Sequence, residues 1–251
     1  IVFKNNDLLK NFKYVGFKTS QKSMIVDDPQ QIDKLPQYQN GDWWIQDYAS
    51  MLPIHLMTNI KGKNIIDMCA APGGKTFQAI SENGNVDIIE KNINRAKILK
   101  ENLNRLKFDD KINILDVLQI SDRKKYDIVL LDAPCSSVGT IRRNPEIFFR
   151  NQSTNIDKIV SLQNRLLNKA KNLVKTKGII LYMVCSFLDK ETKILIDNFL
   201  ENNENFQIEK FISKEKSKEL IDKNGYINII PRKFNNFNID GFFAAKLKKY
   251  D

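Results

Sequence analysis

The stretch NIIDMCAAPGGKTFQAI, residues 64 to 80, decides the fold. Its apolar start, NIIDM, predicts a strand, Gly73 and Gly74 break the pattern, and KTFQAI begins a helix. Glycines let backbone N–H groups approach a ligand at the N-terminus of a helix. The loop between strand and helix therefore predicts a site for an anionic or carboxylate-bearing ligand, such as a nucleotide-type cofactor.

Short apolar runs alternate with longer helical patterns on the C-terminal side of this stretch. We expect strands over residues 64–68, 85–90, 111–115, 126–132 and 178–184, with helices from 75 to about 83, over 93–106, over 156–174 and from about 189 to 200. Residues 206–211 and 240–247 are expected to form a closing strand pair. This alternation predicts an α/β fold with a parallel sheet and helices on both faces.

The N-terminal part has a different character. Residues 1 to 40 show no clear periodicity, and we expect them to be an irregular appended segment, with the main domain over residues 41–251. Trp43 and Trp44 follow this segment; they are expected to pack in the core, with base stacking as the alternative.

Composition limits the classes of function. The formal net charge is +10, and the first 60 residues carry six Lys and six Asp, so the positive excess lies in residues 61 to 251. This charge favours a polyanionic partner such as nucleic acid, although a composition rich in Lys could also produce it. We see no leader or membrane-length apolar run and expect a cytoplasmic, monomeric protein. Three Cys without a CxxC pair, and His55 as the single His, argue against a disulfide framework, a zinc site and hydrolase chemistry.

Candidate functional residues follow the strands. Ligands bind outside the carboxyl ends of the strands in open α/β sheets. Cys69 follows the first expected strand, Asp132 and Cys135 follow the fourth, and Cys185 follows the fifth. All three cysteines thus fall at the expected ligand edge, which favours a chemical role over simple packing.

Two carboxylates also follow strands. Glu90 ends the second strand, where nucleotide-binding folds keep an acid for ribose hydroxyls, and Asp116 follows the third strand, where it could meet an adenine amino group. Each could also be an ordinary solvated acid. A phosphate loop remains an alternative, because Gly74-Lys75-Thr76 matches its end, but Cys69 stands where that motif needs Gly.

Four motifs together resemble one enzyme family. They are DMCAAPGGKT (67–76), LLDAPCSSVGTIRRNPE (130–146), YMVCS (182–186) followed by Glu191, and DGFFAAKL (240–247). Together with GDWWIQDYAS (41–50), they resemble the Sun/RsmB family (NOP2/Sun) of S-adenosylmethionine-dependent RNA cytosine-5 methyltransferases. The resemblance implies a Rossmann-like class I methyltransferase sheet over residues 41–251, with residues 1–40 as the tail of an RNA-binding subdomain.

The resemblance also implies roles for residues that bind the cofactor S-adenosylmethionine. The residues implied to hold its methionine part are Cys69, Ala70, Ala71, Pro72, Gly73, Gly74 and Lys75. Glu90 is implied to bind the ribose, Asp116 the adenine, and Asp132 the junction between cofactor and base.

The catalytic roles implied by the resemblance centre on two thiols. Cys185 is implied to add to carbon 6 of cytosine and Cys135 to assist its release, while Asp132 bonds the ring near N3 with help from Lys75. Nearby positive charge is expected to help Cys185 ionise. Val184 stands where the family usually has Thr, which leaves a noncatalytic RNA-binding module as an alternative.

We expect the RNA to be bacterial small-subunit ribosomal RNA, with transfer RNA as the alternative, and we expect no metal and no membrane partner. The target base must be single-stranded or flipped out, because stacking covers carbons 5 and 6. Arg142 and Arg143 are the expected phosphate contacts, with Arg150 as a weaker third.

Overall fold

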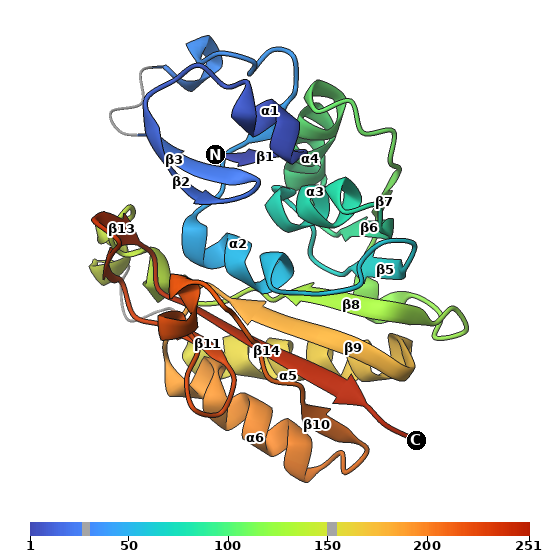
Figure 1. The fold of residues 1–251 in the computed structure, drawn as a ribbon. Coiled ribbons are helices and arrows are strands. Elements are labelled where there is room, and N and C mark those ends of the chain that lie inside the picture. The colour runs from blue at the N-terminus through green and yellow to red at the C-terminus, as the bar shows by residue number, and fades with distance from the viewer. Residues whose placement is uncertain (27–30, 150–154) are drawn as a thin grey trace.

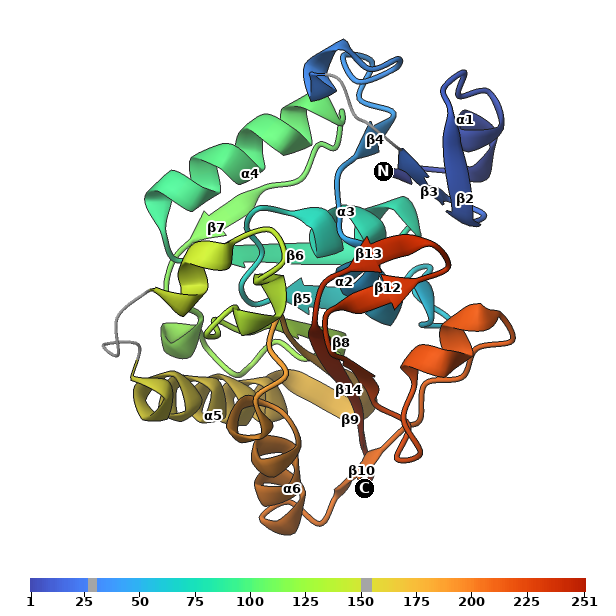
Figure 2. The ribbon, with the colours of Figure 1, turned by 90° about the vertical axis from the view of Figure 1, so that its left-hand side faces the viewer.

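A mixed sheet dominates the computed structural model, which describes residues 1–26, 31–149 and 155–251. Within these ranges the sheet has eight strands (Figures 1 and 2). In spatial order they are β10 (Phe206–Ile208), β14 (Phe242–Lys249), β9 (Val174–Val184), β8 (Tyr126–Asp132), β5 (Asn64–Asp67), β6 (Asn85–Glu90) and β7 (Ile112–Ile114), with β11 (Ile227–Ile229) also pairing with β14. The five strands from β9 to β7 are parallel, and β14 is antiparallel to β9. The carboxyl ends of the parallel strands therefore meet at one edge.

Helices cover both faces of the sheet, as the alternation of apolar runs predicts (Figure 1). On one face lie α2 (Tyr48–His55), α3 (Gly74–Ser81) and α4 (Ile93–Arg105), and on the other lie α5 (Ile156–Leu173) and α6 (Lys193–Glu201). Side chains alternate between the faces along β8, because Ile128 and Leu130 pack with α2 and α3, whereas Val129 and Leu131 pack with α5 and α6. Burial on both faces explains the continuous apolar sequence of this strand.

Residues 1–26 and 31–44 form a second, smaller sheet, so the expectation of an irregular segment over residues 1–40 is wrong. Its strands are β1 (Val2–Phe3), β2 (Gly16–Ser20), β3 (Ser23–Val26) and β4 (Trp43–Trp44), in the order β2-β3-β1-β4, and α1 (Asn6–Lys10) packs beside them. These strands are too short to show a period in sequence. Trp43 and Trp44 are both buried, which confirms the expected core packing.

Several boundaries differ from the expected ones. Strand β9 begins at Val174, directly after α5, so Gly178 lies inside the strand instead of ending the helix. Helix α6 begins at Lys193, because the preceding residues form a 3-10 turn. A hairpin not foreseen from sequence consists of β12 (Arg232–Phe234) and β13 (Phe237–Ile239). The 3-10 turns are η1 (Ile32–Lys34), η2 (Val117–Gln119), η3 (Val138–Thr140), η4 (Pro145–Phe148), η5 (Asp189–Glu191) and η6 (Lys216–Leu220).

None of the helices described in residues 1–26, 31–149 and 155–251 is both long and apolar enough to cross a membrane.

Candidate active site

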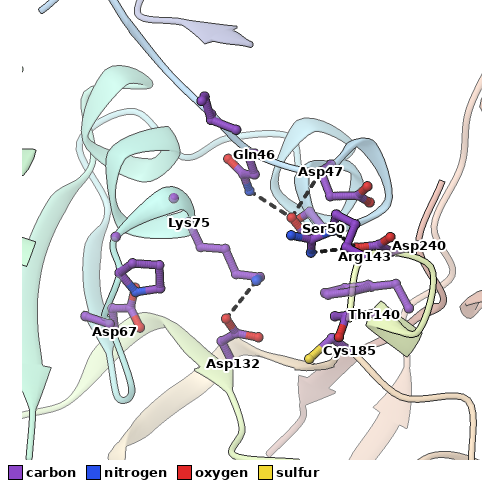
Figure 3. A pocket seen from close by; sticks show the side chains of 16 residues that line it. Gln46, Asp47, Ser50, Asp67, Lys75, Asp132, Thr140, Arg143, Cys185 and Asp240 are labelled. Carbon is purple, nitrogen blue, oxygen red and sulfur yellow. Dashed lines mark hydrogen bonds and ion pairs between the residues drawn. The ribbon is translucent and has the colours of Figure 1, made fainter. Parts of the chain in front are cut away.

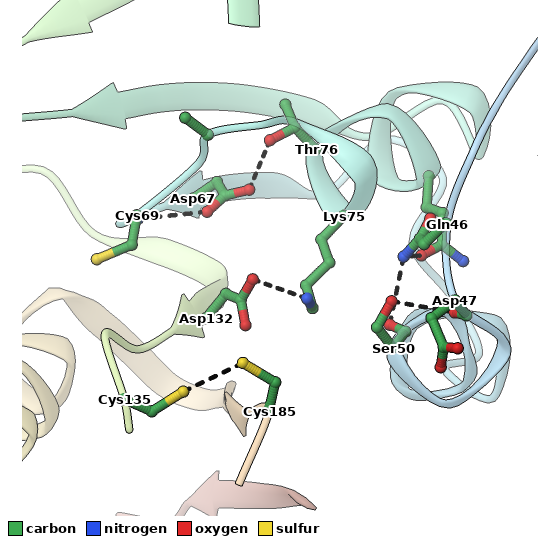
Figure 4. A network of polar contacts seen from close by, with 12 residues as sticks. Gln46, Asp47, Ser50, Asp67, Cys69, Lys75, Thr76, Asp132, Cys135 and Cys185 are labelled. Atoms are coloured by element: carbon green, nitrogen blue, oxygen red, sulfur yellow. Dashed lines mark hydrogen bonds and ion pairs between the residues drawn. The ribbon is translucent and has the colours of Figure 1, made fainter. Parts of the chain in front are cut away.

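Two cysteines from neighbouring strands meet at the carboxyl edge of the sheet. Cys135 follows β8 and Cys185 follows β9, and their sulfur atoms lie 3.2 Å apart (Figure 4). The contact follows from the register, because Asp132 at the end of β8 pairs with Met183 near the end of β9. The hydroxyl of Ser137 lies 3.6 Å from the sulfur of Cys185. Both cysteines are free thiols.

The two thiols differ in acidity. The hydrogen bond from the Cys135 thiol lowers the pKa of Cys185 to about 7, against the opposing effects of burial and of the Asp132 charge; Ser137 and Lys75 make smaller contributions in the lowering direction. The same hydrogen bond, together with burial, raises the pKa of Cys135 well above its usual value. Cys185 is therefore the thiol that ionises first, and only the thiolate is strongly nucleophilic.

The third cysteine has another environment. Cys69 follows β5 at the same edge, but burial and the carboxylates of Asp67, Asp132 and Glu90 raise the pKa of its thiol. Such a group stays protonated near neutral pH and is a poor nucleophile. The three cysteines thus share the edge, while only Cys135 and Cys185 form a pair.

A cavity of about 260 Å³ opens beside Cys185 (Figure 3). The Nζ atom of Lys75, at the start of α3, lies 2.7 Å from Oδ2 of Asp132, at the end of β8. Both side chains line the cavity with Cys185, and the Lys75 ammonium also lies 5.1 Å from the ring centre of Phe242. The cavity thus presents a nucleophile, an acceptor and a cation to one bound molecule.

The opposite wall of this cavity holds acids that sequence reasoning did not single out. Asp240, just before β14, is buried and accepts hydrogen bonds from Nε of Arg142 at 3.1 Å and from Nε of Arg143 at 2.7 Å. Asp47, the N-cap of α2, lies 3.4 Å from Arg142, and burial followed by the nearby Asp240 charge raises its pKa. Both acids stand in quoted motifs, GDWWIQD and DGFF, so a search of those motifs for polar residues could have found them.

The two expected RNA contacts are therefore held in fixed positions. Arg143 lines the 260 Å³ cavity, whereas Arg142 lies just outside it, and about half of the Arg143 side chain is exposed. Because Asp240 engages one edge of each guanidinium group, it orients both arginines. Arg150 lies outside the described residues.

A second cavity, of about 460 Å³, lies over the ends of β5, β6 and β7 and is lined by Cys69, Glu90 and Asp116. Glu90 is 4% exposed and accepts hydrogen bonds from the backbone N–H groups of Ala71 at 3.2 Å and Asn92 at 2.8 Å. Asp116 accepts from the Leu118 N–H group and pairs with Lys91. Two fixed carboxylates face the same space.

The structure divides the expected cofactor-binding residues between the two cavities. Cys69, Glu90 and Asp116 line the 460 Å³ cavity; Ala70, Pro72, Gly73, Gly74, Lys75 and Asp132 line the 260 Å³ cavity. Ala71 lines neither of these two cavities as described, but its backbone N–H group binds Glu90 and its carbonyl oxygen accepts from Arg95. The loop from Cys69 to Lys75, which we call the glycine loop, therefore separates the two cavities.

Gly73 shapes the glycine loop. Its φ of +115° lies in a region that favours glycine, and a Cβ atom there would stand 2.1 Å from the Phe77 ring. Directly after it, α3 begins at Gly74 and carries Lys75 and Thr76, whose hydroxyl donates to the buried carboxylate of Asp67 at 2.6 Å (Figure 4). This close packing fixes the start of the helix beside Asp132.

Comparison with known proteins identifies relatives. The family model described as 16S rRNA methyltransferase RsmB/F matches residues 54–248. Ribosomal RNA small subunit methyltransferase B of Pasteurella multocida is 32% identical over 233 residues, which cover 88% of this chain and 50% of that protein. The chain thus spans about half the length of the curated relatives that it matches first.

Solved structures share the fold. A methyltransferase homolog protein from Pyrococcus horikoshii superposes with a TM-score of 0.73 at 25% identity, covering 98% of this chain and 85% of the other. NSun6 from the same organism, solved with SFG, gives a TM-score of 0.74 at 24% identity, covering 92% of this chain and 60% of the other.

Proposed function

Because the chain belongs to the RsmB/F family of 16S rRNA methyltransferases, we propose that it methylates carbon 5 of a cytosine in RNA with S-adenosylmethionine as the donor. The observation that carries the proposal is the contact between the Cys135 and Cys185 sulfurs beside the Lys75–Asp132 ion pair. A thiolate next to a fixed acid and cation suits the activation of a pyrimidine ring, which carbon 5 needs because it is a poor nucleophile.

Cys185 starts the proposed reaction. Its thiolate adds to carbon 6, the electron pair of the double bond moves to carbon 5, and carbon 5 becomes nucleophilic. The Asp132 carboxylate accepts a hydrogen bond from the amino group beside ring nitrogen N3, and the Lys75 ammonium, 2.7 Å from Asp132, offsets the negative charge that addition places on the ring. The wall that carries Arg143 and Asp240 closes the opposite side of the cavity.

Cys135 acts after Cys185 has added. While Cys185 is a thiolate, its charge and the S–H···S hydrogen bond keep Cys135 protonated. Addition to carbon 6 turns Cys185 into a neutral thioether, so the thiolate charge and the hydrogen bond no longer raise the pKa of Cys135, whereas burial and the Glu191 charge still do. Cys135 can then lose its own proton to water and take the proton from methylated carbon 5. The electron pair of that C–H bond restores the ring double bond, and the C–S bond at carbon 6 breaks to release the Cys185 thiolate.

The cavity lined by Glu90 fits the proposed donor. Its buried carboxylate can accept hydrogen bonds from ribose hydroxyls, Asp116 can accept from an amino group, and the side chains of Leu118, Leu162 and Pro134 offer apolar surface for a flat ring. S-adenosylmethionine, when bound, supplies an electrophilic methyl group. The glycine loop from Cys69 to Lys75 would hold its methionine part between the two cavities.

RNA is the proposed partner, and small-subunit ribosomal RNA is the proposed substrate. The net charge of +10 and the exposed part of Arg143 at the cavity support this choice. We further propose that residues 41–251 form the catalytic domain and that residues 1–40 belong to an RNA-binding subdomain.

Nucleoside analysis tests the proposed function. The protein is incubated with S-adenosylmethionine and unmodified small-subunit ribosomal RNA or unmodified transfer RNA, and the digested RNA is analysed by mass spectrometry. We expect 5-methylcytidine in the ribosomal RNA. Methylation of transfer RNA alone would contradict the proposed ribosomal RNA substrate. A methyl group on a ribose or an exocyclic nitrogen would contradict the proposed mechanism.

A further inference from the structure

A buried carboxylate lies behind the two thiols. Glu191, at the end of η5, has no exposed surface, and its carboxylate accepts four hydrogen bonds. Oε1 accepts from the backbone N–H group of Ser136 at 2.9 Å and from Nε2 of Gln163 at 2.9 Å. Oε2 accepts from the hydroxyl of Ser186 at 2.5 Å and from the hydroxyl of Ser136.

The donors come from the segments that carry the cysteines. Ser136 directly follows Cys135, and Ser186 directly follows Cys185. Gln163, on α5, completes the link, because its Nε2 atom also donates to the carbonyl oxygen of Pro134 at 2.9 Å. One carboxylate therefore connects both cysteine loops and the helix behind them.

We propose that Glu191 is a positioning residue, whose carboxylate clamps the Cys135 loop to the Cys185 loop and so fixes the contact between the two sulfurs. The role that this contact has in catalysis rests on the proposed function, whereas the clamp itself is a property of the free protein.

The chemistry of the site favours a geometric role over an electrostatic one. Burying a carboxylate is costly unless its lone pairs are satisfied, and no Lys or Arg among the described residues forms an ion pair with Glu191. Its negative charge opposes ionisation of Cys135, so it does not help to form a thiolate there. A carboxylate is, however, an acceptor only, and it can receive four converging donors, which an amide cannot.

Alkylation of Cys185 by iodoacetamide, without RNA or cofactor, tests the clamp. In the wild type, Cys135 donates to Cys185 and makes it reactive near neutral pH. In Glu191→Gln, one amide edge presents hydrogens to the serines, the loops separate, and this hydrogen bond weakens. We expect the apparent pKa of Cys185 to rise toward ~8.5, so that the alkylation rate at pH ~7 falls about tenfold.

The direction of this change separates the two explanations. Removal of a negative charge alone would lower the pKa of a neighbouring thiol or leave it unchanged. The charged groups that face Cys185 from other elements, Asp132, Lys75 and Arg143, are untouched by the substitution. A rise in the Cys185 pKa therefore reports loss of position.

A double-mutant cycle with Cys135→Ala provides the second readout. Cys135→Ala alone should also raise the pKa of Cys185. Adding Glu191→Gln to Cys135→Ala should cause little further change, because both substitutions remove the same contact, the hydrogen bond between Cys135 and Cys185. Tyr126→Phe is the control for general loss of stability. It removes the hydrogen bond that the Tyr126 hydroxyl donates to Asp87 at 2.5 Å, at the opposite end of β8, and it should leave Cys185 alkylation unchanged.

If Glu191→Gln does not fold, Ser186→Ala is used instead, because it removes one hydrogen-bond donor and leaves the Glu191 carboxylate with three. We expect a smaller decrease in the rate of Cys185 alkylation than Glu191→Gln would cause. An unchanged or lower pKa of Cys185 in the variants, or additive effects in the cycle, overturns the proposal. Failure of methylation in the wild type with the expected alkylation pattern would instead reject the proposed function and leave the clamp standing.

Discussion

The sulfurs of Cys135 and Cys185 lie 3.2 Å apart although 50 residues separate them in the chain. Each follows one of two adjacent parallel strands, β8 and β9, so the crossover through α5 brings them together. Their contact makes them chemically unequal, because one proton lies between two sulfurs and the hydrogen bond stabilises the thiolate of Cys185. This difference in acidity assigns Cys185 as the nucleophile of the proposed reaction and Cys135 as the base of its later step.

The methylation rate should depend on pH through Cys185. Its pKa is lowered to about 7, so below that value the thiolate fraction, and with it the single-turnover rate, should fall about tenfold per pH unit. Above it the rate should level off. A profile of single-turnover rates from pH ~5.5 to ~9 measures this. A rate that keeps rising to pH ~9, as an ordinary thiol would give, contradicts the lowered pKa.

Lys75→Met should slow methyl transfer strongly. The substitution keeps the length of the side chain but removes the ammonium group, 2.7 Å from Asp132, so Asp132 loses its partner and Cys185 a nearby positive charge. We expect the rate at saturating cofactor to fall by about 10²- to 10³-fold.

Lys91→Met is the matched control for this substitution. Lys91 lies the same 2.7 Å from a carboxylate, Asp116, but its side chain is 73% exposed and belongs to the other cavity. Its rate at saturating cofactor should stay close to that of the wild type. Equal losses in both variants would reject the special role of Lys75.

Glu90→Gln should weaken binding of S-adenosylmethionine. The buried carboxylate faces the 460 Å³ cavity, and loss of a charged acceptor for hydroxyl groups raises the Kd by about 10- to 100-fold. Isothermal titration calorimetry measures the affinity, with Glu101→Gln on the exposed face of α4 as the control. An unchanged Kd would place the ribose elsewhere.

Arg143→Ala should weaken RNA binding uniformly across sequences. Arg143 lines the 260 Å³ cavity with part of its side chain exposed, and loss of one phosphate contact should reduce the slope of log K against log salt by about 1. Lys124→Ala removes one charge from an exposed site before β8, away from the cavity, and should leave the slope unchanged. Equal effects of the two would mean that only net charge matters.

The expected sheet could be read largely from the sequence, and the reason is physical. Strands β6 and β8 have the expected bounds, because buried parallel strands are continuous apolar runs that glycine and polar residues interrupt. The start of β9 at Val174 was not predicted, because its residues 175–177, KTK, are polar. The N-terminal sheet was not predicted either, because its strands of two to five residues depend on pairing between segments that are distant in sequence.

The candidate site was predictable to the extent that strand ends reveal it. Cys135, Cys185 and Asp132 could be singled out because each lies at or just after the carboxyl end of an expected strand, where open α/β sheets bind ligands. The contact between the sulfurs and the pairing of Asp240 with Arg142 depend on residues about 50 to 100 positions apart, which one sequence does not relate. The same holds for the donors that converge on Glu191.

The most direct test of the central claim is covalent trapping of RNA by Cys135→Ala. The variant is incubated with S-adenosylmethionine and unmodified small-subunit ribosomal RNA and analysed on a denaturing gel, beside the wild type and Cys185→Ala. We predict that Cys135→Ala stays attached to methylated RNA through Cys185, that the wild type releases its product, and that Cys185→Ala neither methylates nor attaches. Release of methylated RNA by Cys135→Ala at the wild-type rate, or methylation by Cys185→Ala, would contradict the assignment of the two thiols.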